Sequence, residues 1–171
     1  MSRIHTAALA ASAAIAFVVG GWAAFAPRAF YDSFPGMLGT WVSTDGPFNE
    51  HLIRDVGALY LGLGAASIAG LVWRSTAMFR ALGLAWTTFG ALHLGYHVTH
   101  LGHNEAAEDA ASITSLAISL ALGLVLLSPG REGRRADVAS ATDAASRTTT
   151  RTATPTAAST RTAADTKEMT R

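Results

Sequence analysis

An uncharged run near the start of the chain, residues 4–26, strongly limits what the chain can fold into. It consists mainly of aliphatic and aromatic residues and is long enough to cross the hydrocarbon core of a bilayer as one helix. Three further segments, residues 50–73, 78–100 and 105–127, have similar length and few charges. Half of the chain is hydrophobic and only 15% is charged, which is too apolar for an ordinary soluble domain. We expect an all-α multi-pass membrane protein, an up-down bundle of four transmembrane helices.

A secretory signal peptide is the alternative interpretation of the first segment. Residues 24–26 have the small-x-small pattern of a cleavage site. Pro27 would stand directly after the cut, where proline suits the peptidase poorly, so a retained helix is favoured. Both interpretations leave the following segment on the outer side of the membrane.

Two segments lie outside the expected helices. Residues 28–48 combine aromatic residues with the turn signals Pro35-Gly36 and Asp45-Gly46-Pro47, so we expect an extracytoplasmic loop on the membrane surface. Residues 129–171 consist mainly of Ala, Thr, Ser and Arg and contain too few apolar residues to offset the entropy of ordering. We expect a disordered cytoplasmic tail. Its acidic residues dilute its arginines, so we expect a solvated tail and no nucleic-acid partner. The expected partner of the protein is the lipid bilayer that its helices cross.

The short connections carry a charge asymmetry that predicts orientation. One side of a four-helix arrangement holds Arg3, Arg74, Arg80, Arg131, Arg134 and Arg135, and the other holds most acidic residues of the connections. The positive-inside rule then places both termini in the cytoplasm of a cell-membrane protein. Glycines along residues 50–73, among them Gly57, Gly62 and Gly64, offer surfaces for close helix packing. Such surfaces serve packing within one chain as well as between chains, so both a monomer and an oligomer agree with the sequence.

Ionisable residues gather around the end of the third expected helix. Histidines at i, i+4 and i+7 share one helical face and are joined by carboxylates at the same level of the bundle. The resulting candidate metal ligands are His93, His97, His100, Glu50, Asp55 and Glu108. Such mixed donors suit a divalent ion and do not separate zinc, copper and iron. The absence of cysteine excludes thiolate ligands and thiol nucleophiles.

Two other interpretations of these residues stay open. A purely structural network that includes His51, Arg54 and Asp109 would neutralise buried charge and stabilise the bundle. A haem would need imidazoles from two helices, such as His51 with His93 or His97, and ranks below a metal ion. His5 and His103 are expected to be solvated.

No catalytic residue is predicted. A polar stripe at Glu105, Glu108, Ser112, Ser115 and Ser119 follows one face of the last expected helix and should lie against other helices. No Gly-x-Ser-x-Gly elbow accompanies the serines, which favours helix–helix hydrogen bonding over a nucleophile. Whether the chain is an enzyme stays open, with a non-enzymatic role favoured.

Several motifs together resemble those of a group of small bacterial four-helix integral membrane proteins. They are Phe34-Pro35-Gly36, Trp41, Gly46-Pro47-Phe48-Asn49-Glu50-His51, Arg54-Asp55-Val56-Gly57-Ala58 and the histidine run from His93 to His100. The resemblance covers roughly residues 1–128. It implies the four-helix topology and a joint role for these motifs, and it implies no activity.

Overall fold

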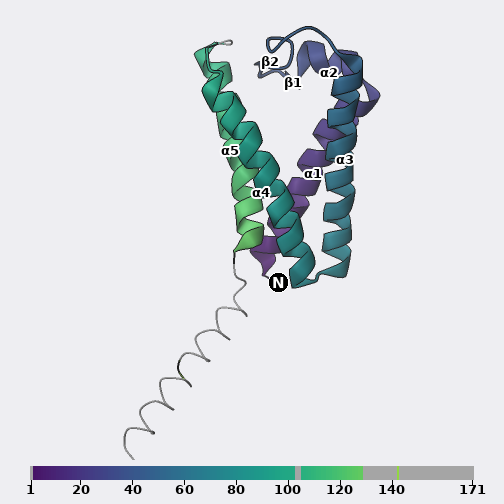
Figure 1. Ribbon diagram of the computed structural model, residues 1–171, viewed down its shortest axis with the longest axis vertical. Coiled ribbons are helices and arrows are strands. Elements are labelled where there is room, and N and C mark those ends of the chain that lie inside the picture. The colour runs from purple at the N-terminus through teal and green to yellow at the C-terminus, as the bar shows by residue number, and fades with distance from the viewer. Residues whose placement is uncertain (1, 103–104, 129–141, 143–171) are drawn as a thin grey trace, which may run out of the picture. The chain divides into compact units, whose positions relative to one another are not determined.

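The computed structural model describes residues 2–102, 105–128 and 142, and the elements discussed here all belong to one compact unit, Met1–Gly133. Its helices are α1 (Arg3–Phe25), α2 (Pro27–Ser33), α3 (Glu50–Trp73), α4 (Thr76–Thr99) and α5 (Ala106–Leu127) (Figure 1). Between α2 and α3, β1 (Pro35–Gly36) pairs antiparallel with β2 (Gly39–Thr40) in a minimal hairpin. The all-helical prediction is confirmed.

α3 and α4 begin at or close to the predicted positions, and a polar side chain caps each of them. Asn49 Oδ1 accepts a hydrogen bond from the Leu52 N–H at 3.1 Å, which starts α3 as predicted. α4 starts before the predicted residue 78, because Ser75 Oγ accepts from the Met78 N–H at 3.1 Å. From the sequence we also expect Asn104 to cap the last helix, but this residue lies outside the described ones. The predicted tail, apart from residue 142, lies outside them too.

The prediction that residues 28–48 form a loop is wrong for residues 28–40, which form most of α2 and the hairpin. Pro27 takes the first helical position, where its missing N–H costs no hydrogen bond. The ring of Trp22 packs edge-on against those of Phe30 and Phe34, with centroids 6.0 and 5.8 Å away. Phe30, which the sequence assigned to the membrane interface, is only 6% exposed. Residues 27–48 therefore form a folded cap, held by aromatic packing.

Three helices of the described chain, α1, α3 and α5, are long and apolar enough to cross a membrane. α4 is as long as α3 but is not among them. His93, His97 and a pair of threonines lower the hydropathy of its sequence. Large apolar side chains such as Leu59 and Leu124 project outward from these helices, as expected for surfaces in contact with lipid.

Small residues set the pairing of the helices. A Cβ at Gly20 would lie 2.9 Å from the Gly57 carbonyl oxygen, and one at Gly57 would meet the backbone of Ala24, so α1 and α3 pack backbone to backbone. α4 and α5 pack in the same way, because a Cβ at Gly123 would lie 2.8 Å from the Thr87 nitrogen. The bundle thus consists of two tight pairs, α1–α3 and α4–α5.

The two ends of the bundle can be assigned from contacts between distant segments. At the end that holds the N-terminus, the Arg74 guanidinium donates to Thr6 Oγ1 at 3.4 Å. His5 lies at this end too and is only 4% exposed, so the prediction that it is solvated is wrong. Its Nε2 lies 3.0 Å from the Ser128 carbonyl oxygen and its Nδ1 lies 2.5 Å from Ser2 Oγ. We call this the basal end and the opposite end, with α2 and the hairpin, the cap end.

Candidate functional site

The candidate site is a cavity at the cap end. The α1–α3 and α4–α5 pairs draw apart toward this end, and the cap lies across it (Figure 1). The cavity between them has a volume of about 540 Å³. Its lining residues come from all four long helices and from the cap: Ile15, Val19, Phe30, Tyr31, Phe34, Pro35, Leu38, Trp41, Val42, Asp45, Gly46, Pro47, Asn49, Leu52, Ile53, Val56, Tyr60, His93, His97, Ser112, Ser115, Leu116 and Ser119.

Polar groups are distributed unevenly around this cavity, which we call the cap cavity. The α1 and α3 wall consists largely of aliphatic and aromatic side chains, and the cap adds further rings. The α4 and α5 wall supplies both imidazoles and three hydroxyls: His93, His97, Ser112, Ser115 and Ser119. The serine stripe predicted to lie against other helices therefore borders a space between helices.

His93 and His97 form the polar centre of this wall. They are successive residues on one face of α4, with ring centroids 5.1 Å apart, and both side chains are partly buried. The ring centroid of Phe89, one helical turn earlier, lies 5.2 Å from that of His93. His93 Nδ1 is buried and has no hydrogen-bond partner among the described residues. A buried polar atom without a partner costs about 1–3 kcal/mol, so a hydrogen-bonding group in the cavity would stabilise this wall.

The third histidine of the run has different surroundings. His100 is exposed and stacks on Tyr96, with ring centroids 4.1 Å apart. Its Nδ1 lies 2.9 Å from the Tyr96 carbonyl oxygen. His100 follows the end of α4 at Thr99 and is not among the residues that line the cap cavity.

The ionisable residues at the start of α3 pair locally. Arg54 Nε lies 2.8 Å from Glu50 Oε1, and its Nη1 donates to the Ala24 carbonyl at the end of α1. His51 Nε2 lies 3.3 Å from Asp55 Oδ2, and both side chains are more than half exposed. Both i,i+4 pairs lie within α3 at exposed positions, and the hydrogen bond from Arg54 to Ala24 links α3 to α1.

The two carboxylates of α5 brace the cap end. The Glu108 carboxylate packs against Gly39 of the hairpin, where a Cβ would lie only 2.5 Å from Glu108 Cδ. Gly39 has a φ of +126°, which also favours glycine. Asp109 Oδ2 accepts a hydrogen bond from the Gly102 N–H at 2.8 Å. Glu108 therefore contacts the hairpin, while Asp109 holds the connection from α4.

These placements bear on the predicted metal site without deciding it. Among the described residues, which include all six candidate ligands, no three His, Asp or Glu side chains come together around one possible ion position. His93 and His97 are the candidate ligands that lie next to each other in the cavity wall. A metal ion there stays a prediction.

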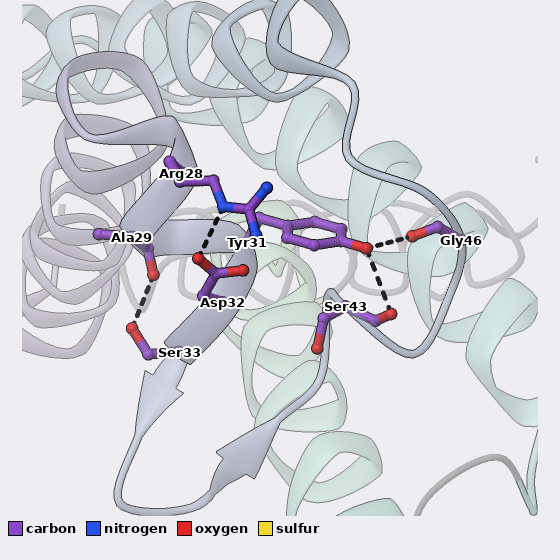
Figure 2. Close-up of polar contacts among 7 residues, drawn as sticks. All are labelled: Arg28, Ala29, Tyr31, Asp32, Ser33, Ser43 and Gly46. Atoms are coloured by element: carbon purple, nitrogen blue, oxygen red, sulfur yellow. Dashed lines mark hydrogen bonds and ion pairs between the residues drawn. The ribbon is translucent and has the colours of Figure 1, made fainter.

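Contacts within its own segment fix the fold of the cap (Figure 2). Tyr31 OH donates to the Gly46 carbonyl at 2.6 Å, which ties the end of the cap to α2. Arg28 Nε lies 2.7 Å from Asp32 Oδ2, and this hydrogen bond raises the pKa of Arg28 further above its usual range. The Arg28 guanidinium also lies over the ring of Phe48, 5.0 Å from its centroid.

Comparison of the chain with protein-family models, with curated proteins and with solved structures found no match. The resemblance to small bacterial four-helix membrane proteins stays a prediction. Sequence reasoning missed the cap cavity, although the serine stripe on α5 and the His93–His97 face of α4 were its visible signals.

Proposed function

We propose that the chain is a four-span membrane protein that binds a small molecule in the cap cavity. The fourth crossing is supported by chain direction. α3 and α5 both run from the cap end to the basal end, so a chain that crosses in both must return between them. α4 is the helix that makes this return, and its two imidazoles, His93 and His97, line the cavity.

The proposed orientation places the cap end outside the cytoplasm of a cell-membrane protein. Arg3, Arg74 and Arg80 lie at or near the basal end of the described helices, whereas Asp32 and Asp45 belong to the cap. The positive-inside rule then places the basal end, and with it the N-terminus, in the cytoplasm. The cap cavity would accordingly lie at the extracytoplasmic level of the bilayer.

The observation that carries the binding function is the composition of the cap cavity. A volume of about 540 Å³ is in the range of small-molecule sites. The walls are mostly apolar, and the few polar groups converge from α4 and α5, which is typical of sites that orient a ligand by a small number of hydrogen bonds. The unpartnered Nδ1 of His93 is one such group.

Site-specific thiol labelling tests binding, because the chain contains no native cysteine. Ser115→Cys places a thiol in the cavity wall, and Thr114→Cys places one on an exposed face one residue away. Both variants of the full chain are prepared in lipid nanodiscs and labelled with N-ethylmaleimide, with and without the apolar probe 1-pyrenebutanol. At about ten times its Kd the probe occupies ~90% of sites, so labelling at position 115 should slow about tenfold.

Labelling at position 114 serves as the matched control for partition of the probe into lipid. We expect its rate to stay unchanged by the probe. Equal effects of 1-pyrenebutanol at positions 114 and 115, or no effect at either, would overturn the proposed binding function.

A divalent ion on His93 and His97 is a second candidate, favoured by the approach of the two imidazoles on one face of α4. Zinc titration of the purified protein, followed by elemental analysis, should then show one retained ion per chain. His97→Ala should abolish retention, whereas His51→Ala, which changes an exposed imidazole, should not. Retention of no zinc by the unsubstituted protein excludes this candidate.

A further inference from the structure

A second hollow lies beside the cap cavity, on the outer surface of the bundle. It is a groove of about 360 Å³ between α3 and α4, lined by Val56, Tyr60, Phe89, Leu92 and His93. Three of these residues, Val56, Tyr60 and His93, also line the cap cavity. The two hollows therefore border the same three side chains.

The helix pairing explains why the groove is at this position. α3 packs tightly on α1 and α4 packs tightly on α5, while α3 and α4 are joined by a short turn at the basal end and separate above it (Figure 1). Leu92 lies at the edge of the groove, and its side chain is 73% exposed. In a four-span arrangement, this edge is in contact with lipid.

The charged residues around the cap cavity determine whether a charged or an uncharged ligand group can bind there. Neither arginine nor lysine is among the residues that line it, and Asp45 is the acidic one. Arg28 of the cap and Arg54 near the start of α3 are paired with carboxylates, Arg28 with Asp32 and Arg54 with Glu50. An anionic head group would therefore enter a poorly solvated space without a cation, which is strongly unfavourable. Imidazole and hydroxyl groups suit an uncharged carbonyl or hydroxyl.

We propose that the ligand of the cap cavity is an uncharged amphiphile, an apolar body with a carbonyl or hydroxyl head, that enters from the lipid between α3 and α4. This inference rests on the proposed binding function. The head would contact the His93–His97 wall, and the apolar body would pack against the α1 and α3 wall.

A pair of probes that differ only in head charge tests the ligand class. In the Ser115→Cys background, 1-pyrenebutanol is compared with 1-pyrenebutanoate at pH 8, where the carboxylate is ionised because its ordinary pKa is about 4–5. The hydroxyl probe should slow labelling about tenfold near saturation, and the carboxylate should slow it less than about twofold. Equal protection by both probes would overturn the ligand class and leave the binding function standing. Protection by neither probe would overturn the binding function itself.

The entry route is tested by narrowing the groove. Leu92→Trp adds bulk at the edge of the groove, and Val56→Trp does so from the facing helix. In the Ser115→Cys background, either change should delay the onset of protection by 1-pyrenebutanol about fivefold or more, as for binding limited by access. Leu84→Trp is the control, since Leu84 is an exposed α4 residue outside the groove. An unchanged onset in both groove variants, each with wild-type thermal stability, would overturn lateral entry.

Discussion

Ser67 and Trp86 form a buried polar contact in the middle of an otherwise apolar core. Trp86 Nε1 donates to Ser67 Oγ at 3.1 Å, and Ser67 Oγ donates to the Leu63 carbonyl at 2.8 Å. Both side chains are 0% exposed. This contact links α3 and α4 on the basal side of the ring contact between Tyr60 and Phe89.

Ser67→Ala should lower stability, because it leaves the Trp86 indole N–H buried without an acceptor. The cost of such a group is about 1–3 kcal/mol. Unfolding in detergent, followed by tryptophan fluorescence, measures the change. Thr114→Ala is the control and should change stability little, since the exposed Thr114 hydroxyl donates to the Ala110 carbonyl of its own helix. Equal stability of the two variants would contradict a structural role for this contact.

The histidine run shows what could be predicted at the residue scale. Helical spacing places His93 and His97 on one face of α4, and the structure agrees. Spacing within one helix does not give the rotation of neighbouring helices. Arg54 could therefore not be assigned from the sequence, and its contacts are with Glu50 and with α1. His5 shows the same limit, since its partner Ser128 is brought near only by the folding of the whole bundle.

At the scale of elements, the helix limits were predictable because local side chains determine them. Asn49 caps α3 from within its own first turn, and no distant residue is needed. The cap was not predictable in this way. Its aromatic residues look equally suited to a membrane interface, and only contact with Trp22 of α1 turns Phe30 and Phe34 inward.

A matched pair of glycines in α3 tests the close approach of α1 and α3. In Gly57→Ala the new methyl group meets the backbone of Ala24, which cannot move aside as a side chain can. We expect a loss of about 1–3 kcal/mol or more, as for overpacking in a core. Gly62→Ala meets nothing within 4 Å and should be neutral. Thermal unfolding of both variants in the same detergent is the measurement, and equal destabilisation would argue against the pairing.

At the scale of the whole molecule, the number of crossings is a prediction that labelling can decide. Ala77→Cys lies in the first turn of α4 and Leu101→Cys lies just beyond its end, both at exposed positions. An impermeant maleimide added to intact cells should label position 101 and leave position 77 unlabelled until the membrane is permeabilised. Thr44→Cys in the cap is expected to behave like Leu101→Cys. If positions 77 and 101 behave alike, α4 does not cross the membrane.

Occupancy of the cap cavity is the central claim, and native mass spectrometry measures it directly. The full chain released from nanodiscs loaded with 1-pyrenebutanol should carry one bound probe molecule. Ser119→Phe, which fills the cavity from α5, should abolish the bound form. Thr114→Phe, which adds the same ring on an exposed face, should preserve it. Equal occupancy in both variants, or no bound probe in the unsubstituted chain, would contradict a ligand site between the two helix pairs.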